Sequence, residues 1–293
     1  MSLVTLTELM KDAEEKRYAV GAYNVMNLDM IRGILAAAED EKSPVILSFA
    51  EVHIPYIPLE YIAPIMLEAA RNAKVPVAVH LDHGQDFEVI IRAMKYGFSS
   101  VMFDGAHLPL EENIKKTLEI TKIAKALGVS VEAELGTILR PEGGGDDDYV
   151  EEEYDEDDMY TNPEHARIFM ENTEIDALAV AFGTAHGVYT REPVLDFNRL
   201  QEIKTITNMP LVMHGGSGLD DKSYVKSIES GIRKLNYYST MAYEVANEVL
   251  TKLSFNAKRN KKSYYHDISM WAIEAIRKDI SRTMRIFGSA GKA

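Results

Sequence analysis

The sequence predicts an α/β protein folded as a single closed (β/α)8 TIM barrel. Three observations favour this class: a length of 293 residues, short apolar runs at fairly even spacing, and an amphipathic helical pattern after each run. Near-continuous apolar strands that alternate with helices are typical of a parallel sheet covered by helices, and eight such units close a barrel. No G-x-G-x-x-G turn follows the first run, which disfavours an open dinucleotide-binding sheet.

The expected strands are short segments rich in β-branched and apolar residues: 19–25, 44–50, 75–83, 100–106, 129–136, 177–183, 210–216 and 234–239. Between them, apolar residues at three- and four-residue spacing predict helices, for example over 30–41 and 110–127. A long acidic loop follows the fifth strand, and a C-terminal helical extension, with a last helix over about 269–287, follows the eighth. No linker divides the chain, so residues 1–293 are predicted to form one domain.

Composition narrows the classes of function. The chain is 46% hydrophobic and 27% charged, which is typical of a soluble globular protein, and it has no cysteine for a disulfide or a thiolate metal site. Its net charge of −14 disfavours nucleic acid as a partner. Residues 1–20 lack a basic start followed by an apolar core, so we expect no signal peptide, and no apolar run is long enough for a membrane span. We therefore expect a cytoplasmic protein without membrane contact. The acidic run over 142–158 is typical of a solvated loop.

Polar side chains gather at the C-terminal ends of the expected strands, where barrels of this kind hold their active sites. The strand interiors are almost purely apolar, so chance does not explain the placement of Asn24, Ser48, Asp82, His83, Asp104, Glu132, Glu134, His186, His214 and Asn236. Asn24 and Ser48 are therefore candidates for substrate binding.

Three histidines end the runs HLDHG, GTAHG and VMHGG, and each stands directly before a glycine. Three imidazoles from three strands can converge at the mouth of a barrel, and three protein ligands with one open position define a catalytic zinc site. The sequence thus predicts that His83, His186 and His214 bind Zn²⁺. The alternative is that each histidine only hydrogen-bonds a loop. The remaining histidines are expected in structural or surface roles, with His80 inside the barrel: His53, His80, His107, His165 and His266.

Asp82 adjoins His83, and a carboxylate beside a metal is suited to general acid/base catalysis. The alternative is that Asp82 orients an imidazole. Glycine-rich residues 215–218 follow the seventh strand, and residues 236–239 close the eighth. Because phosphate sites in such barrels are made by these two loops, Gly215, Gly216 and Ser217 are candidates to bind a phosphate, together with Ser239.

Several longer motifs resemble one family. HLDHG at 80–84, SVMFDGAHLPLEENI at 100–114, VSVEAELG at 129–136, AVAFGTAHGVY at 179–189, VMHGGSGL at 212–219 and GIRKLN at 231–236 look like class II ketose-bisphosphate aldolases. The similarity runs nearly end to end, from YAVGAYNV to RIFGSAGKA.

The resemblance implies a zinc-dependent, reversible aldol cleavage of a ketose 1-phosphate or 1,6-bisphosphate to dihydroxyacetone phosphate and an aldehyde. It implies that His83, His186 and His214 bind the zinc, with Glu134 as an alternative ligand, and that Asp82 is the acid/base at the C4 hydroxyl. Glu142, on the acidic loop, matches the glutamate that protonates C3.

For the ketose half that becomes dihydroxyacetone phosphate, the resemblance implies binding by Gly187, by Gly215, Gly216 and Ser217, and by Asn236, Tyr237, Tyr238 and Ser239. Asn236 would also stabilise the enediolate. A monovalent cation, usually Na⁺, near the phosphate and a homodimer or homotetramer are further implications.

Two positions depart from the family. Tyr237-Tyr238-Ser239 replaces the usual Val-Ala-Thr or Val-Asp/Asn-Thr, which changes the wall beside the sugar chain. Ile273 stands where fructose-bisphosphate members place an arginine for the second phosphate, with Arg277 one turn later. Three alternatives therefore stay open: a tagatose-bisphosphate aldolase, an aldolase for a ketose 1-phosphate without the distal phosphate, and a sugar-phosphate binding protein without turnover. A metal-dependent hydrolase is disfavoured because the first strand has no His-x-His pair.

Overall fold

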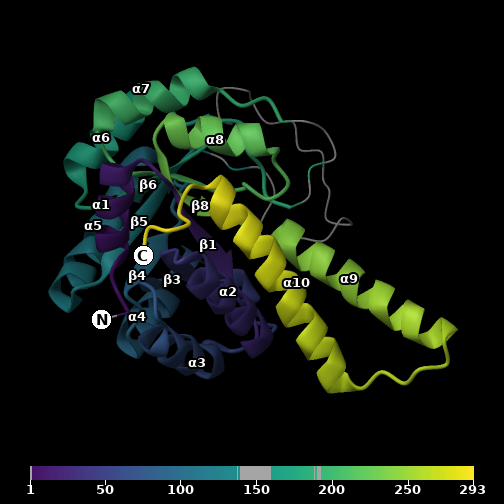
Figure 1. Ribbon diagram of the computed structural model, residues 1–293. Coiled ribbons are helices and arrows are strands. Elements are labelled where there is room, and N and C mark those ends of the chain that lie inside the picture. Colours follow the sequence, from purple (N-terminus) through teal and green to yellow (C-terminus); the bar gives the residue numbers. More distant parts are fainter. Residues whose placement is uncertain (1, 137, 139–159, 188, 190–192) are drawn as a thin grey trace.

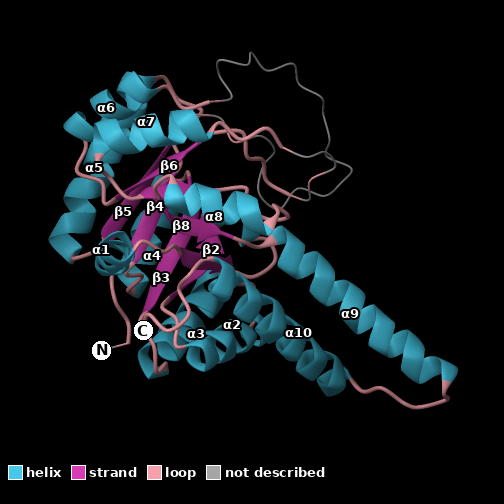
Figure 2. Ribbon diagram, turned by 45° about the horizontal axis from the view of Figure 1, so that its top comes forward, coloured by secondary structure: helices cyan, strands magenta, loops and turns pink. Residues whose placement is uncertain are grey.

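The protein folds as a closed barrel of parallel strands in the order β1 to β8, with β8 paired to β1, as predicted. The computed structural model describes residues 2–136, 138, 160–187, 189 and 193–293. The strands are β1 Val20–Asn24, β2 Val45–Ala50, β3 Val77–Gly84, β4 Ser100–Phe103, β5 Ser130–Leu135, β6 Ala177–Val180, β7 Leu211–Met213 and β8 Ile232–Asn236. Figure 2 shows these strands enclosed by helices.

The helices follow the predicted alternation. They are α1 Leu6–Lys16, α2 Leu28–Glu41, the short 3-10 helix η1 Glu51–His53, α3 Leu59–Asn72, α4 Phe87–Tyr96, α5 Leu110–Leu127, α6 Pro163–Asn172, α7 Phe197–Thr207, α8 Asp221–Glu229, α9 Ser239–Lys258 and α10 Tyr265–Ile286. The helices expected over 30–41 and 110–127 are α2 and α5. No helix in the described part of the chain is long and apolar enough to cross a bilayer.

Most expected strands were too long at their C-terminal ends, and the eighth was displaced. It was predicted over 234–239 but ends at Asn236, because Ser239 already begins α9. β7 ends at Met213, shortly before Gly215, whose φ of +62° lies in the left-handed region that ends an extended strand.

The inside of the barrel has an apolar lower layer and a polar upper layer. Alternate residues of a strand face the same side, so the inward positions succeed one another two residues apart. The lower layer packs against Leu6, Leu9 and Met10 of α1, which covers this end, and consists of Val20, Ala22, Ile46, Ala78, Met102, Ala177, Ala179 and Val212. The polar side chains of the next inward positions therefore collect at the opposite, C-terminal end of the strands.

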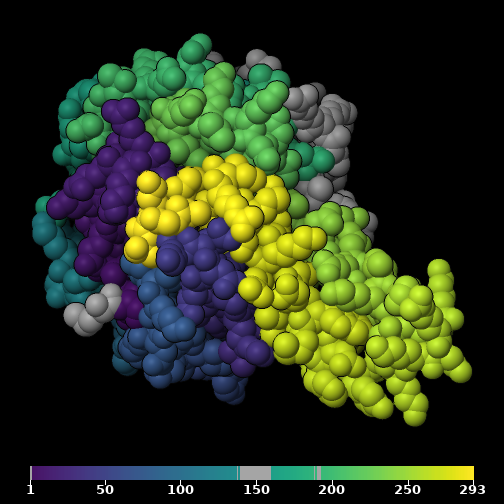
Figure 3. Space-filling view, viewed as in Figure 1, coloured from purple at the N-terminus to yellow at the C-terminus, as the bar shows by residue number. Residues whose placement is uncertain are grey.

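The C-terminal helices α9 and α10 form an arm that projects from the barrel (Figures 1 and 3). The inner part of α10 packs against α2, where Gly33 allows close approach. A Cβ atom at Gly33 would lie only 2.7 Å from the Cβ of Ile276 and 3.0 Å from the carbonyl oxygen of Ile273. Both isoleucines are buried, so this contact joins the arm to the barrel.

We expect Gly33→Val to lower the free energy of unfolding by about 1–3 kcal/mol, because overpacking a tight contact forces backbone shifts. Urea denaturation measures the loss. Arg32→Val is the matched control, since Arg32 is exposed on the same helix and its replacement costs only a few tenths of a kcal/mol in helix propensity. Equal urea midpoints for the two variants would show that the α2–α10 contact accommodates the larger side chain without a loss in the free energy of unfolding.

Candidate metal centre and active site

Three predicted histidines meet at the open end of the barrel. His83 lies near the end of β3, His186 follows β6, and His214 follows β7. One ring nitrogen from each lies within 4.8 Å of the others. The ring centroids of His83 and His214 are 4.5 Å apart, and those of His83 and His186 are 4.9 Å apart.

A break in regular strand geometry lets two adjacent residues of β3 reach the same site. Neighbouring side chains in a strand normally point to opposite faces. Here the register of β3 with β4 shifts between Leu81 and Gly84, and His83 has a φ of +45°. Gly84 fits this turn because a Cβ there would lie 2.6 Å from the carbonyl oxygen of Met102. Asp82 and His83 can thus both contribute to the site.

Two carboxylates orient the imidazoles. Nδ1 of His83 lies 2.9 Å from Oδ2 of Asp104, and Nε2 of His214 lies 2.8 Å from Oε1 of Glu132. When each neutral ring donates its proton to its carboxylate, the other nitrogen keeps a lone pair. Those two nitrogens, Nε2 of His83 and Nδ1 of His214, face each other at 2.8 Å. Two lone pairs at this distance repel each other, and a cation bound between the two nitrogens would remove the repulsion.

This donor set fits a divalent metal. At tetrahedral Zn²⁺, with Zn–N bonds of about 2.0–2.1 Å, neighbouring nitrogens lie about 3.3 Å apart. A small parting of His83 and His214 would reach that spacing, and His186 supplies a third nitrogen.

Asp82 is held as a carboxylate by amides and by positive charge. Its Oδ2 accepts a 2.9 Å hydrogen bond from Nδ2 of Asn24, and its Oδ1 accepts one of 2.9 Å from Nδ2 of Asn236. Burial alone would raise its pKa, but His83 and Lys234 hold the pKa of Asp82 well below its usual range. The three predicted residues Asn24, Asp82 and Asn236 therefore form one connected group.

Glu134 lies beside the histidines, and its pKa is shifted in the opposite direction from that of Asp82. Burial, and then the charge of Asp104, raise its pKa well above the usual range. Its Oε2 has no hydrogen-bond partner in the part of the chain that the structure describes, and it lies 4.0 Å from Nδ1 of His83. His83, Asp104 and Glu134 form a second group with metal-ligand atoms within 4.8 Å of one another. Glu134 is thus a side chain that a metal could recruit.

The predicted phosphate loops lie side by side. A Cβ at Gly215 would lie 2.6 Å from the backbone of Ala185, so glycine lets the loops after β6 and β7 touch. Tyr189 joins these loops, because its hydroxyl accepts from the amide of Ala185 and donates to the carbonyl of Gly215. Oγ of Ser217 accepts a 2.9 Å hydrogen bond from the amide of Tyr238, which joins the loops after β7 and β8.

Tyr237 is not brought to the mouth. Asn236 points inward, so the next side chain points outward. Accordingly, the ring of Tyr237 packs edge-on against Tyr23, its hydroxyl donates to Asp279 of α10, and its amide donates to the carbonyl of Ala22. The prediction that Tyr237 binds substrate is corrected for its side chain.

The other predicted residues are placed as follows. The side chain of Ser48, in β2, lies inside the barrel, and its buried Oγ has no hydrogen-bond partner among the described residues. Gly187 directly follows His186, Gly216 accepts a 2.5 Å hydrogen bond from Tyr224, and Ser239 is the first residue of α9. Glu142 lies outside the described residues.

Sequence reasoning missed Lys234 altogether and gave Glu132 and Asp104 no role. Nζ of Lys234 lies 2.8 Å from Oε2 of Glu132 and 4.0 Å from Oδ1 of Asp82, and its side chain is fully buried. The signal was its position: Lys234 stands two residues before Asn236 in a strand, hence on the same inward face.

A parallel barrel whose mouth gathers three imidazoles, ionised carboxylates and glycine-rich loops defines the class of barrel proteins equipped for metal and phosphate chemistry. The comparisons name the family. The sequence model of the family described as "Fructose-bisphosphate aldolase class-II" matches residues 4–292. The chain therefore belongs to this metal-dependent family of carbon–carbon lyases.

Relatives and solved structures agree. A probable fructose-bisphosphate aldolase of Bacillus subtilis is 40% identical over 296 residues and covers 100% of both chains. The crystal structure of the YdjI aldolase from Escherichia coli K12 is similar with a TM-score of 0.84, 34% identity and 99% coverage of each chain. A putative fructose-1,6-biphosphate aldolase from Coccidioides immitis matches with a TM-score of 0.83 and 32% identity, over 98% of this chain and 97% of that one.

His80 lies inside the barrel, as predicted, with Nδ1 2.8 Å from Oγ of Ser100. Burial, and then the charge of Lys234, lower the pKa of His80 to about 3. In the unfolded chain a histidine titrates near pH 6.5. Between these values the unfolded state binds a proton that the folded state does not, so this residue lowers stability as pH falls from about 6.5.

We therefore expect His80→Gln to reduce the loss of unfolding free energy between pH 7.5 and pH 5 by about 2 kcal/mol. Urea denaturation of chelated protein at the two pH values measures it. His266→Gln is the control, because His266 is 78% exposed and should leave the pH dependence unchanged. An unchanged pH dependence in His80→Gln would contradict a neutral, buried His80.

Proposed function

We propose that this protein is a zinc-dependent aldolase that reversibly cleaves a ketose bisphosphate, fructose 1,6-bisphosphate by default, to dihydroxyacetone phosphate and an aldehyde such as glyceraldehyde 3-phosphate. The observation that carries the proposal is the 2.8 Å approach of Nε2 of His83 to Nδ1 of His214, each ring backed by a carboxylate. Membership of the class II family supports the reaction type.

In this proposal His83, His186 and His214 hold the zinc, and Glu134 is an alternative ligand. Zinc suits three nitrogen donors with one open position. When bound, the ion would act as a Lewis acid at the ketose carbonyl and disperse the charge of the enediolate. Burial, and then the charge of Asp104, raise the pKa of Glu134 well above its usual range, and a nearby cation would lower it.

Asp82 is the proposed acid/base. In the cleavage direction its carboxylate takes the proton of the C4 hydroxyl as the C3–C4 bond breaks, and in condensation it returns that proton. Asn24 and Asn236 hold both carboxylate oxygens, so the base is oriented before the substrate arrives. We also propose that the Asn236 amide stabilises the enediolate oxygen by donating to it.

Protonation of C3 then needs a second acid. We propose Glu142 for this step, on the basis of its match in the motif ELGTILRPEGG. For the phosphate we propose the backbone amides of Gly187, Gly215 and Gly216 with Ser217, and the 236–239 segment through Tyr238 and Ser239. Ser48 is the remaining binding candidate, and Na⁺ or another monovalent cation is proposed near the phosphate.

Several ketoses are candidates for the substrate, and they differ at the end away from the dihydroxyacetone phosphate half. Ile273 is buried between α10 and α2, and Nε of Arg277 contacts Oδ2 of Asp40 at 2.5 Å, so neither offers a cation to a second phosphate within this chain. The ring of Tyr238 lies 5.1 Å from that of His53. Tagatose 1,6-bisphosphate and a ketose 1-phosphate without a distal phosphate are therefore alternatives. A non-catalytic sugar-phosphate binding protein is the alternative of another class.

The first test is exchange of the C3 proton of dihydroxyacetone phosphate with solvent, followed by NMR in D₂O. We expect exchange that chelation abolishes and zinc restores. Asp82→Ala should lower ketose cleavage by about 10²–10⁴-fold, the usual contribution of general acid/base catalysis, without removing the metal. His83→Ala should abolish both reactions.

Exchange that survives chelation, or that survives in the double variant Asp82→Ala and His83→Ala, would refute the zinc mechanism. Binding of dihydroxyacetone phosphate without exchange would support the non-catalytic alternative. A panel of ketose phosphates completes the test, and equal turnover with and without the distal phosphate would indicate that no second phosphate is recognised.

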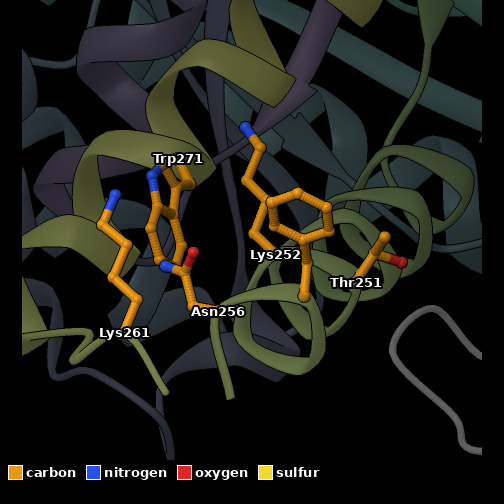
Figure 4. A pocket seen from close by; sticks show the side chains of 6 residues that line it. Thr251, Lys252, Asn256, Lys261 and Trp271 are labelled. Atoms are coloured by element: carbon orange, nitrogen blue, oxygen red, sulfur yellow. The ribbon is translucent and has the colours of Figure 1, made fainter. Parts of the chain in front are cut away.

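We further propose a cytoplasmic homodimer or homotetramer whose contact includes the arm. α9 has twenty residues but buries only Met241 and Asn256, and Leu250 and Phe255 are 62% and 53% exposed. A hollow of about 310 Å³ in the arm is lined by Thr251, Lys252, Phe255, Asn256, Lys261 and Trp271. Figure 4 shows the side chains that line it. None of these is a predicted site residue, and so much exposed apolar surface is typical of an interface.

We expect Leu250→Asp to raise the dissociation constant of the oligomer at least about tenfold, because it places a charge in an apolar contact. Light scattering during size-exclusion chromatography measures the mass. Leu127→Asp is the matched control: it makes the same substitution at a leucine that is 58% exposed on the barrel. An unchanged mass for Leu250→Asp, or a monomeric native protein, would contradict the proposed contact.

A further inference from the structure

We propose that Lys234 is a positioning residue for the metal centre: its ammonium fixes Glu132, and Glu132 in turn holds His214 with Nδ1 toward the metal. This inference rests on the proposed zinc site.

Lys234 is enclosed at a place where a lysine needs partners. It lies on the inward face of β8, two residues before Asn236, and its side chain has no exposed surface. Lysine is almost never fully buried unless it is paired, and removal of one partner from a buried pair is costly. Its position therefore requires fixed negative charge around it.

Glu132 supplies that charge with both oxygens. Nζ of Lys234 lies 3.0 Å from Oε1 and 2.8 Å from Oε2 of Glu132. The ammonium thus hydrogen-bonds Oε1 and is ion-paired with Oε2, which restricts rotation of the carboxylate. Oε1 is the same oxygen that lies 2.8 Å from Nε2 of His214, so the position of the ammonium determines where His214 finds its acceptor.

The consequence reaches the metal side of the ring. With Nε2 held by Glu132, Nδ1 of His214 faces His83 at 2.8 Å, and the Asn236 amide lies 3.2 Å from the same nitrogen. A rotation of Glu132 would release Nε2 and allow the ring to turn. Lys234 thus acts on the metal through two hydrogen-bonded residues without touching it.

The ammonium also explains why a second cluster of possible metal ligands, next to the three histidines, does not require a metal ion. His80, Asp82 and Glu132 bring ligand atoms within 4.8 Å of one another, as the three histidines do. Lys234 lies among them, 2.8 Å from Glu132 and 4.0 Å from Asp82. A positive charge of the chain itself already lies among these carboxylates and offsets part of their charge, which favours binding of an external cation at His83, His186 and His214 instead.

The test compares zinc affinity with the stability of the metal-free protein. We expect Lys234→Met to raise the zinc dissociation constant about 10- to 100-fold, the usual effect of removing a residue that orients a ligand. Competition with a chromophoric chelator measures the constant, and urea denaturation of zinc-free protein measures stability. The double variant Lys234→Met with Glu132→Gln removes both charges, so it should regain stability relative to Lys234→Met while zinc binding stays weak.

Lys204→Met is the matched control. Lys204 is a partly buried lysine that, like Lys234, is paired: its Nζ lies 3.0 Å from Glu14 and donates to the carbonyl of Met209. Its loss should reduce stability and leave zinc affinity unchanged.

A dissociation constant within twofold of the native value in Lys234→Met would overturn the inference. So would native zinc affinity in the double variant, which also decides the matter if Lys234→Met fails to fold. Tight zinc binding in the native protein without aldol chemistry would refute the proposed function and leave this inference standing. Absence of zinc binding in the native protein would refute both.

Discussion

The structure depends on one constraint: charge placed inside a closed barrel must be balanced within the barrel. Glu132 and Lys234 meet this constraint as a directly bonded pair with no exposed surface. Asp82 meets it through two amides and the nearby positive charge. Because isolated buried charges are far costlier than paired ones, these partners are mutually required. Hydrogen bonds therefore join the charged groups of the polar upper layer from Asp82 through Asn236 and His214 to Glu132 and Lys234, and the apolar lower layer beneath them is closed by α1.

The same network gives neighbouring carboxyl groups of the site different pKa values. Two carboxylates act as acceptors behind His83 and His214, and the low pKa values of about 2 for Asp104 and Glu132 keep them ionised, although burial opposes this. Glu134 lies close by, but burial and the charge of Asp104 outweigh the opposing effect of His83, so its pKa is raised. Similar side chains thus differ in state because of their neighbours. Asp104 and Glu132 orient imidazoles, whereas Oε2 of Glu134 has no hydrogen-bond partner among the described residues and lies 4.0 Å from His83.

Much of this site could be predicted from the sequence, because strand ends in a parallel barrel converge. The histidine motifs and Asp82 were found by their position after apolar runs, and the barrel order followed from the alternation of strands and helices. Lys234 was missed because its role depends on a partner 102 residues away, and spacing along the chain does not reveal cross-barrel pairs. Tyr237 was misplaced for a simpler reason: strict alternation with Asn236 sends its ring toward Tyr23.

The two halves of the site are built by different kinds of element, and this explains why one was easier to predict. The metal half consists of side chains on or just after strands, whose directions are set by barrel register. The proposed far half includes Tyr238, which directly precedes α9 and whose ring centroid lies 5.1 Å from that of His53 on η1, and both residues lie outside the strands. Connecting segments change more readily than a barrel core, because few buried hydrogen bonds depend on them. Under the proposed function, substrate preference can therefore vary at Tyr238 while the histidines and Asp82 keep the geometry that the closed barrel imposes.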